Sequence, residues 1–162
     1  MLWVWSDDNT GVKKVEGTEG TVVGVSISEK RGTGKINVGK GYLEKGKGLL
    51  GDAHVGTERQ VSVLAHEIMK KVAAEGEFSA APGDFAENIT IKGIDNEKMI
   101  PGAHLSLGGA ELEIVQIGKV IDDSHTFNFH GQVPLVTEGR FCSVVHSGWV
   151  SIGDQVRLLN DR

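Results

Sequence analysis

The chain has 162 residues, a formal net charge of −5, a hydrophobic content of 39% and one cysteine. This length suffices for one domain with a real core, and no apolar run approaches the roughly 18 residues needed to span a bilayer. One cysteine excludes an internal disulfide framework, and the acidic balance with a single tyrosine argues against nucleic acid as a main partner. We therefore expect a cytoplasmic globular protein that binds neither a membrane nor nucleic acid.

Short β-strands are the main predicted elements. Residues 3–5 and 10–15 predict an N-terminal edge hairpin, with Asp7, Asp8 and Asn9 at its turn. Further along the chain, alternating and β-branched residues predict strands over 20–28, 60–64, 88–92, 104–107, 111–117 and 155–159. No linker, repeat or low-complexity tract interrupts these segments, which indicates a single domain.

Two helices are predicted between the strands. The first is indicated by apolar residues three or four positions apart at Ala65, Ile68, Met69, Val72 and Ala73. It is expected to end at Gly76. The second is expected to begin after Thr137, to end before Gly148 and to bury Phe141, Val144 and Val145. Many short strands with few helices predict a closed or partly open antiparallel β-barrel with two or three short helices, not a parallel α/β sheet.

A positively charged, glycine-rich segment precedes residue 51. Residues 29–47 carry six basic and two acidic side chains, and residues 31–51 contain seven glycines, Gly51 included. This combination is typical of a site for a specific anion, such as a phosphate-bearing small molecule. The alternative is that the glycines only form turns in a twisted barrel, which does not explain the lysines.

Two glycine patterns in this segment resemble nucleotide-binding motifs. Residues 34–40 resemble a P-loop, but Gly41 stands where the Mg²⁺-binding hydroxyl belongs. Residues 46–51 match a dinucleotide fingerprint without linking a strand to a helix. Neither pattern therefore predicts a nucleotide site.

Asp52 and His54 are two residues apart, so on an extended segment their side chains point the same way. A carboxylate beside an imidazole fixes its tautomer and raises its basicity, as in general bases and metal sites. The alternative is a hydrogen-bonded pair that closes a loop. Arg59 and Gln60 then supply a guanidinium fork and an amide, which suit an anionic ligand rich in heteroatoms, such as a pterin phosphate.

Cys142 and His146 lie four residues apart on the second predicted helix, and hence on one face of it. A neighbouring imidazolium lowers the pKa of a thiol and makes it nucleophilic. The alternative is a structural, half-buried cysteine beside a surface histidine. The sequence contains no cysteine–histidine spacing typical of a metal site.

Four ordered motifs together resemble the MOSC domain, the C-terminal domain of molybdenum cofactor sulfurase. They occupy residues 51–56, 59–62, 82–90 with Gly93, and 116–119. The resemblance covers about residues 20–159, as in a stand-alone bacterial-type member, and leaves residues 1–19 as an N-terminal extension or edge hairpin. It implies a barrel like that of the MOSC and pyruvate-kinase-barrel folds, and a link to the molybdenum cofactor.

The resemblance also implies a cysteine shortly after residues 116–119, which in the family carries persulfide or ligates molybdenum. This chain has no cysteine there, and a gapless count places His125 at that position, with Ser124 beside it. An imidazole can bind a metal but cannot carry a persulfide. His125 is therefore the candidate metal ligand, and His125 and Cys142 are the candidate catalytic residues.

The resemblance implies that the chain binds or delivers molybdenum cofactor (molybdopterin). Family members act in cofactor sulfuration with a pyridoxal-phosphate-dependent cysteine desulfurase, so such an enzyme or a molybdoenzyme is the expected partner. The predicted cofactor-binding residues are Lys30, Arg31, Lys35, His54, Arg59, Gln60, Asn88 and Lys119. The alternatives are a cofactor-dependent reductase of N-hydroxylated compounds, a sulfurtransferase that uses Cys142, and an interaction module without cofactor.

Overall fold

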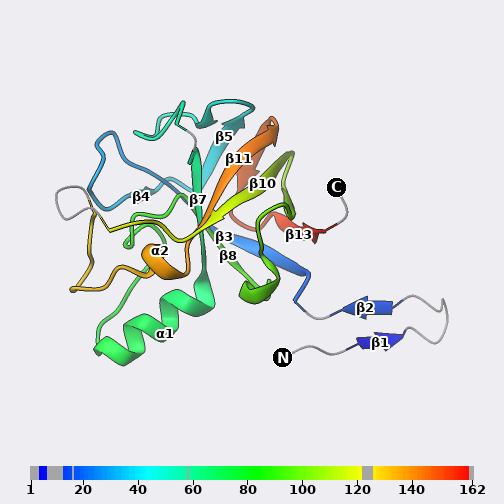
Figure 1. Cartoon of the computed structure of the whole chain (residues 1–162), viewed down its shortest axis with the longest axis horizontal. Helices are drawn as coiled ribbons and strands as arrows, with labels where there is room; N and C mark the ends of the chain where they lie inside the picture. Colours follow the sequence, from blue (N-terminus) through cyan, green and yellow to red (C-terminus); the bar gives the residue numbers. More distant parts are fainter. Residues whose placement is uncertain (1–3, 7–12, 16, 58, 122–125, 161–162) are drawn as a thin grey trace.

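The computed structural model describes residues 4–6, 13–15, 17–57, 59–121 and 126–160. Seven strands close into a mixed β-barrel in the order β13-β9-β10-β11-β7-β8-β3, and β13 pairs with β3 to close it (Figure 1). These strands are β3 (Glu19–Ile27), β7 (Val61–Ala65), β8 (Ile89–Lys92), β9 (His104–Leu107), β10 (Ala110–Ile117), β11 (Arg140–His146) and β13 (Gln155–Leu159). The predicted β-barrel is confirmed, and every barrel strand except β11 coincides with a predicted strand.

One pair of barrel strands is parallel, which a purely antiparallel barrel would not contain. β7 and β8 run parallel, and α1 (His66–Gly76) connects them as a crossover helix on the outside of the barrel (Figure 1). The apolar periodicity of α1 is confirmed, because Met69 and Ala73 are buried. The helix is capped by Glu77 in the left-handed conformation, with φ of 58°.

The second predicted helix is wrong. Helix α2 spans only Pro134–Thr137, and the residues that follow it form β11, which pairs with β10 on one side and β7 on the other. Val144 and Val145 are β-branched and favour an extended backbone. In so short an apolar segment, periodicity alone does not separate a helix from a buried strand.

The glycine-rich basic segment also forms strands. β4 (Ile36–Asn37) pairs with β3, while β5 (Lys40–Glu44) lies between β6 (Gly48–Leu49) and β12 (Gly148–Ser151) in a separate three-stranded sheet. Gly46, at a φ of 79°, lies in the turn between β5 and β6. Gly46 therefore serves in a turn, as the alternative explanation proposed, whereas Gly41 lies within β5 and Gly48 within β6.

An N-terminal hairpin and a short 3₁₀ turn complete the described elements. β1 (Val4–Ser6) pairs with β2 (Lys13–Val15) as predicted, and the hairpin lies to one side of the barrel in Figure 1. A short 3₁₀ turn, η1 (Asn96–Lys98), precedes β9. No helix in the described ranges is long and apolar enough to cross a membrane.

Buried apolar side chains form two clusters on opposite faces of β7. Val61 and Val63 belong to the larger cluster, whose members lie on the barrel strands and on the three-stranded sheet. The smaller cluster consists of Leu64, Met69, Phe85, Leu135 and Phe141, and it holds α1 and α2 against β7 and β11. Because both faces of β7 are covered, the residues at its start are held rigidly, and this is where the candidate site lies.

Candidate functional site

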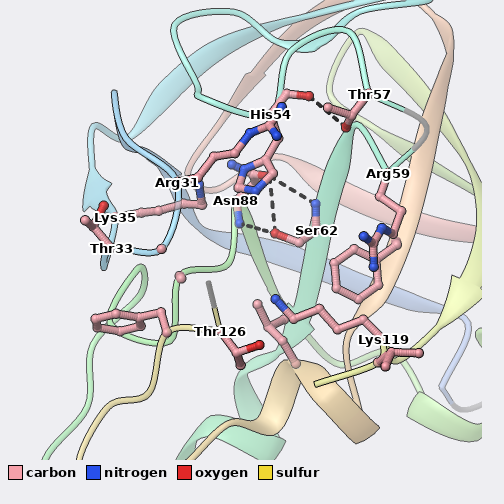
Figure 2. Close-up of a pocket in the computed structure, with 16 residues that line it drawn as sticks. Arg31, Thr33, Lys35, His54, Thr57, Arg59, Ser62, Asn88, Lys119 and Thr126 are labelled. Carbon is pink, nitrogen blue, oxygen red and sulfur yellow. Dashed lines mark hydrogen bonds between the residues drawn. The ribbon is translucent and has the colours of Figure 1, made fainter. Parts of the chain in front are cut away.

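A pocket with a cavity volume of about 510 Å³ lies where five parts of the chain meet. Its wall comes from the loops after β3, before β7 and before β8, from the segment after β10, and from α2 with β11. In Figure 2 Asn88 and Ser62 lie centrally, with Arg59 and Lys119 on one side and Arg31 and Lys35 on the other. The described lining residues include these four cations and no aspartate or glutamate.

Six of the eight predicted cofactor-binding residues line this pocket, namely Arg31, Lys35, His54, Arg59, Asn88 and Lys119. Lys30 is exposed, and its carbonyl oxygen accepts hydrogen bonds from the hydroxyls of Ser28 and Thr33. The side-chain oxygen of Gln60 accepts from the Val144 N–H at 3.1 Å and so connects the start of β7 to β11. The structure therefore places Lys30 and Gln60 outside the pocket lining.

Lys35 differs from the other pocket cations because it is paired with a buried carboxylate. Its Nζ lies 2.7 Å from Asp52 Oδ1, and both side chains are almost completely buried. Burial alone would raise the pKa of Asp52, but hydrogen bonds from His54, Lys35 and the Ser28 N–H hold it well below its usual range. The two side chains thus form a neutral unit in the pocket wall, and other cations supply the positive charge that a ligand meets.

His54 is fixed by the same carboxylate. Its Nδ1 lies 3.2 Å from Asp52 Oδ2, and its backbone N–H donates to that oxygen at 3.1 Å. Residues 52–57 form turns, so the pair closes a loop and does not arise from an extended segment. With the Nδ1 proton directed at Asp52, Nε2 is the ring nitrogen that can accept a hydrogen bond from a ligand.

Arg59 and Lys119 approach the same aromatic ring from the chain segments before β7 and after β10. Arg59 Cζ lies 5.7 Å and Lys119 Nζ 5.9 Å from the centroid of the Phe141 ring. Burial, and then the charges of Arg59 and Lys35, lower the pKa of Lys119. Within the described part of the chain neither Arg59 nor Lys119 has a carboxylate partner. An anion bound between these two cations would relieve their repulsion.

Asn88 and Ser62 form a neutral wall between the cations. Asn88 Oδ1 accepts from the Ser62 N–H at 3.0 Å, and the Asn88 N–H donates to Ser62 Oγ at 3.0 Å (Figure 2). Asn88 Nδ2 donates to the Ser26 carbonyl oxygen at 3.1 Å. These bonds connect β3, β7 and the turn into β8, and they fix the pocket wall.

The sequence did not predict the apolar side of the pocket. Phe127, Leu135 and Phe141 line it, and Phe141 was assigned to the core face of a helix that does not exist. Phe127 could have been proposed from the sequence as a lining residue, because it lies two residues after the candidate ligand His125.

The predicted metal ligand His125 itself lies outside the described residues. Among those described, no group of three potential metal-ligating side chains occurs.

Cys142 lies in the core and not in the pocket. It belongs to β11, its side chain is completely buried, and burial raises the pKa of its thiol far above the usual range. His146 is exposed and lies about 13 Å away along the strand at roughly 3.3 Å per residue. The predicted contact between this thiol and an imidazole on one helix face is therefore wrong.

A family model described as the MOSC domain matches residues 51–118. This match confirms the resemblance to the MOSC domain over residues 51–118. The matched segment contains Asp52, His54, Arg59 and Asn88, and it ends one residue before Lys119. The matched segment therefore supplies five of the polar lining residues, namely His54, Thr57, Arg59, Ser62 and Asn88.

Several solved structures are similar to the chain. The YUAD protein APC1665 from Bacillus subtilis has a TM-score of 0.72 at 16% identity, over 100% of both chains. YiiM from Geobacillus stearothermophilus has a TM-score of 0.62 at 18% identity, over 86% of this chain and 73% of that one. YiiM from Escherichia coli has a TM-score of 0.63 at 23% identity, over 89% and 71%. At these identities the likeness shows the fold alone. No curated protein matches the sequence.

Proposed function

We propose that the pocket binds the molybdenum cofactor by its phosphate and pterin, and that the chain stores or delivers this cofactor. The observation that carries the proposal is the placement of Arg31, Arg59 and Lys119 around one cavity whose described lining contains no carboxylate. The match to the MOSC domain supports the choice of ligand, because that family is associated with the molybdenum cofactor.

The chemistry of the lining fits the phosphate and pterin ends of such a ligand. Two guanidinium forks can each bind a phosphate in bidentate fashion, and Lys119 adds a point charge beside one of them. The cavity volume of about 510 Å³ lies within the range of small-molecule sites. Phe127 and Phe141 provide apolar surface for the face of a planar ring.

The described residues do not fit a thiolate ligand to molybdenum. Cys142 is the only cysteine of the chain, and its side chain is fully buried in the barrel. The cofactor brings its own metal and dithiolene sulfur, so the protein would hold it through phosphate and pterin. Transfer of sulfur by Cys142 needs an accessible thiolate, which burial opposes, and we therefore favour binding and delivery.

Metal and pterin analysis of the protein purified from a cofactor-producing host tests this function. We expect molybdenum and a fluorescent pterin in the wild type, and a large loss of both in the Arg59→Gln/Lys119→Gln double variant. Lys70→Gln/Lys71→Gln, which removes two exposed charges from α1, is the matched control and should keep both. Absence of pterin from the wild type, or equal pterin in the double variant, would contradict the proposal.

A further inference from the structure

Glu87 is a completely buried carboxyl group in the loop that leads into β8. Its Oε2 accepts hydrogen bonds from the Gly83 N–H at 3.1 Å and from the Thr90 hydroxyl at 2.6 Å. Its Oε1 has no partner at hydrogen-bond geometry among the described residues, although the backbone N–H groups of Phe85 and Glu87 lie near the carboxyl group and favour its charged form. A buried polar atom without a partner is costly, so the state of this oxygen needs a physical explanation.

Among the described residues no cation forms an ion pair with this carboxyl group. The Thr90 hydroxyl and the Gly83 N–H, which donate hydrogen bonds to it, are uncharged. Asp84 on the same loop accepts instead from the Ala81 N–H. Burial raises the pKa of Glu87, hydrogen bonds oppose the shift, and no charged side chain contributes to it. A buried carboxylate without a counter-ion is unfavourable, whereas a neutral carboxylic acid needs only hydrogen bonds.

A second buried polar atom without a described partner, Ser26 Oγ, lies near Gly83. Ser26 Oγ is buried and has no partner in the described part of the chain. A Cβ on Gly83 would lie 2.9 Å from this oxygen, while the N–H of Gly83 donates to Glu87. Ser26 Oγ and Glu87 Oε1 make no direct hydrogen bond, so a proton on Glu87 Oε1 would reach this acceptor through an internal water.

The same loop shapes the pocket. The Gly83 carbonyl oxygen accepts from the backbone N–H of Lys35 at 2.9 Å and of Ala86 at 3.0 Å, and both of these residues line the cavity. Asn88, which follows Glu87 directly, forms the neutral wall with Ser62. Glu87 thus holds, through Gly83, two backbone segments of the pocket.

We propose that Glu87 is a positioning residue of the pocket and acts as a neutral carboxylic acid, whose protonated form holds the 82–87 loop under the Ser62–Asn88 wall. The positioning role rests on the proposed function of the pocket, whereas the protonation state does not.

Urea unfolding of wild type and Glu87→Gln between pH 4 and pH 8 tests the protonation state. In the unfolded chain Glu87 ionises above about pH 4.3, while in the folded chain it keeps its proton, so the wild type loses stability relative to the amide as pH rises. We expect the urea midpoint of Glu87→Gln, relative to that of the wild type, to rise steadily from pH 4 to pH 8. Glu75→Gln removes the same charge from an exposed side chain and should show no such trend. A difference in urea midpoint between Glu87→Gln and the wild type that stays constant or changes in the opposite direction as pH rises would overturn the proposal.

An infrared spectrum gives an independent readout that does not require a variant with wild-type stability. We expect the wild type at pH 7 to show the carbonyl band of a protonated carboxyl group, shifted in heavy water and missing in Glu87→Gln. A spectrum without this band would contradict a neutral Glu87.

Binding of inorganic pyrophosphate tests the positioning role. Glu87→Gln should keep the wild-type affinity, because the amide can make the same hydrogen bonds, while Glu87→Leu should lose about tenfold or more. Wild-type affinity in Glu87→Leu would overturn the positioning role. If the wild type itself binds no pyrophosphate, the proposed function fails, and the urea and infrared results still decide the state of Glu87.

Discussion

Asp52 fixes two of the side chains that line the pocket. Its two oxygens accept from Lys35, from the Ser28 N–H and from both the ring and the backbone of His54. One carboxylate therefore neutralises one pocket lysine and orients the pocket histidine. The sequence places Asp52 and His54 together, but it does not reveal Lys35 as the third partner, because that residue lies 17 positions away.

Replacing Asp52 with asparagine should destabilise the protein by about 3–5 kcal/mol at pH 7, because the Lys35 ammonium would stay buried without its counter-charge. The folded-state pKa of Asp52 is lowered, so its contribution is complete above the unfolded value of about 3.9 and is lost as pH falls further. We expect the difference in unfolding free energy between wild type and Asp52→Asn to be constant from pH 8 to pH 5. It should shrink below about pH 4. A difference that persists in acid would show that the charge is not its cause.

Cys142 is expected to be inert in the folded protein. Its buried side chain, with a raised pKa, should not react with a thiol reagent until urea unfolds the chain. Cys142→Ser should cost about 1–3 kcal/mol of stability, because it buries a hydroxyl in an apolar cluster, and should leave cofactor content unchanged. Rapid labelling of the native protein, or loss of cofactor in the variant, would restore a functional role for this thiol.

Among the elements, the sequence predicted those whose pattern is local. The alternation in β3, β7, β8, β9, β10 and β13 and the periodicity of α1 are confirmed. β11 was mistaken for a helix because it is buried between two strands, and pairing with distant strands does not show in local periodicity. The parallel pairing of β7 with β8 was likewise not predicted, although the helix between them is the usual crossover.

In the candidate site, too, the sequence predicted residues that belong to local motifs and missed residues that distant segments contribute. The motifs at 51–56, 59–62 and 82–90 converge because β7 and β8 are neighbours in the barrel, and they supply His54, Arg59, Ser62 and Asn88 to the pocket lining. Phe127 and Phe141 come from segments whose conformation the sequence did not predict. The motif residues could therefore be named in advance, whereas the apolar side of the pocket could not.

The close backbone approach in the loop before β8 can be tested by a substitution at Gly83. Gly83 has a φ of 95°, and a Cβ there would lie 2.5 Å from the Lys35 carbonyl oxygen. Gly83→Ala should therefore destabilise the protein by clearly more than the roughly 1–2 kcal/mol expected for left-handed strain alone, and it should weaken pyrophosphate binding. Gly102 has the same φ with nothing within 4 Å of its Cβ position, so Gly102→Ala is the matched control. Equal losses in the two variants would show that the close approach at Gly83 has no consequence.

For the whole molecule, the distribution of charge separates the pocket from the rest of the surface. The net charge is −5, yet apart from Lys35, which is paired with Asp52, the described lining of the pocket carries three basic side chains and no acidic one. A ligand held through these cations should bind more weakly as salt screens them. We expect pyrophosphate affinity to fall steadily between 0.05 M and 0.5 M salt, and to fall less steeply in Arg59→Gln. Affinity independent of salt would contradict an electrostatic site.

A crystal structure of the protein purified with bound molybdenum cofactor tests most directly whether the pocket binds it. We expect the phosphate to lie within hydrogen-bond distance of Arg59 and Lys119, with the pterin in the cavity beside Asn88 and no bond from a protein sulfur to molybdenum. A cofactor bound elsewhere on the chain, or one whose phosphate contacts none of the pocket cations, would contradict it.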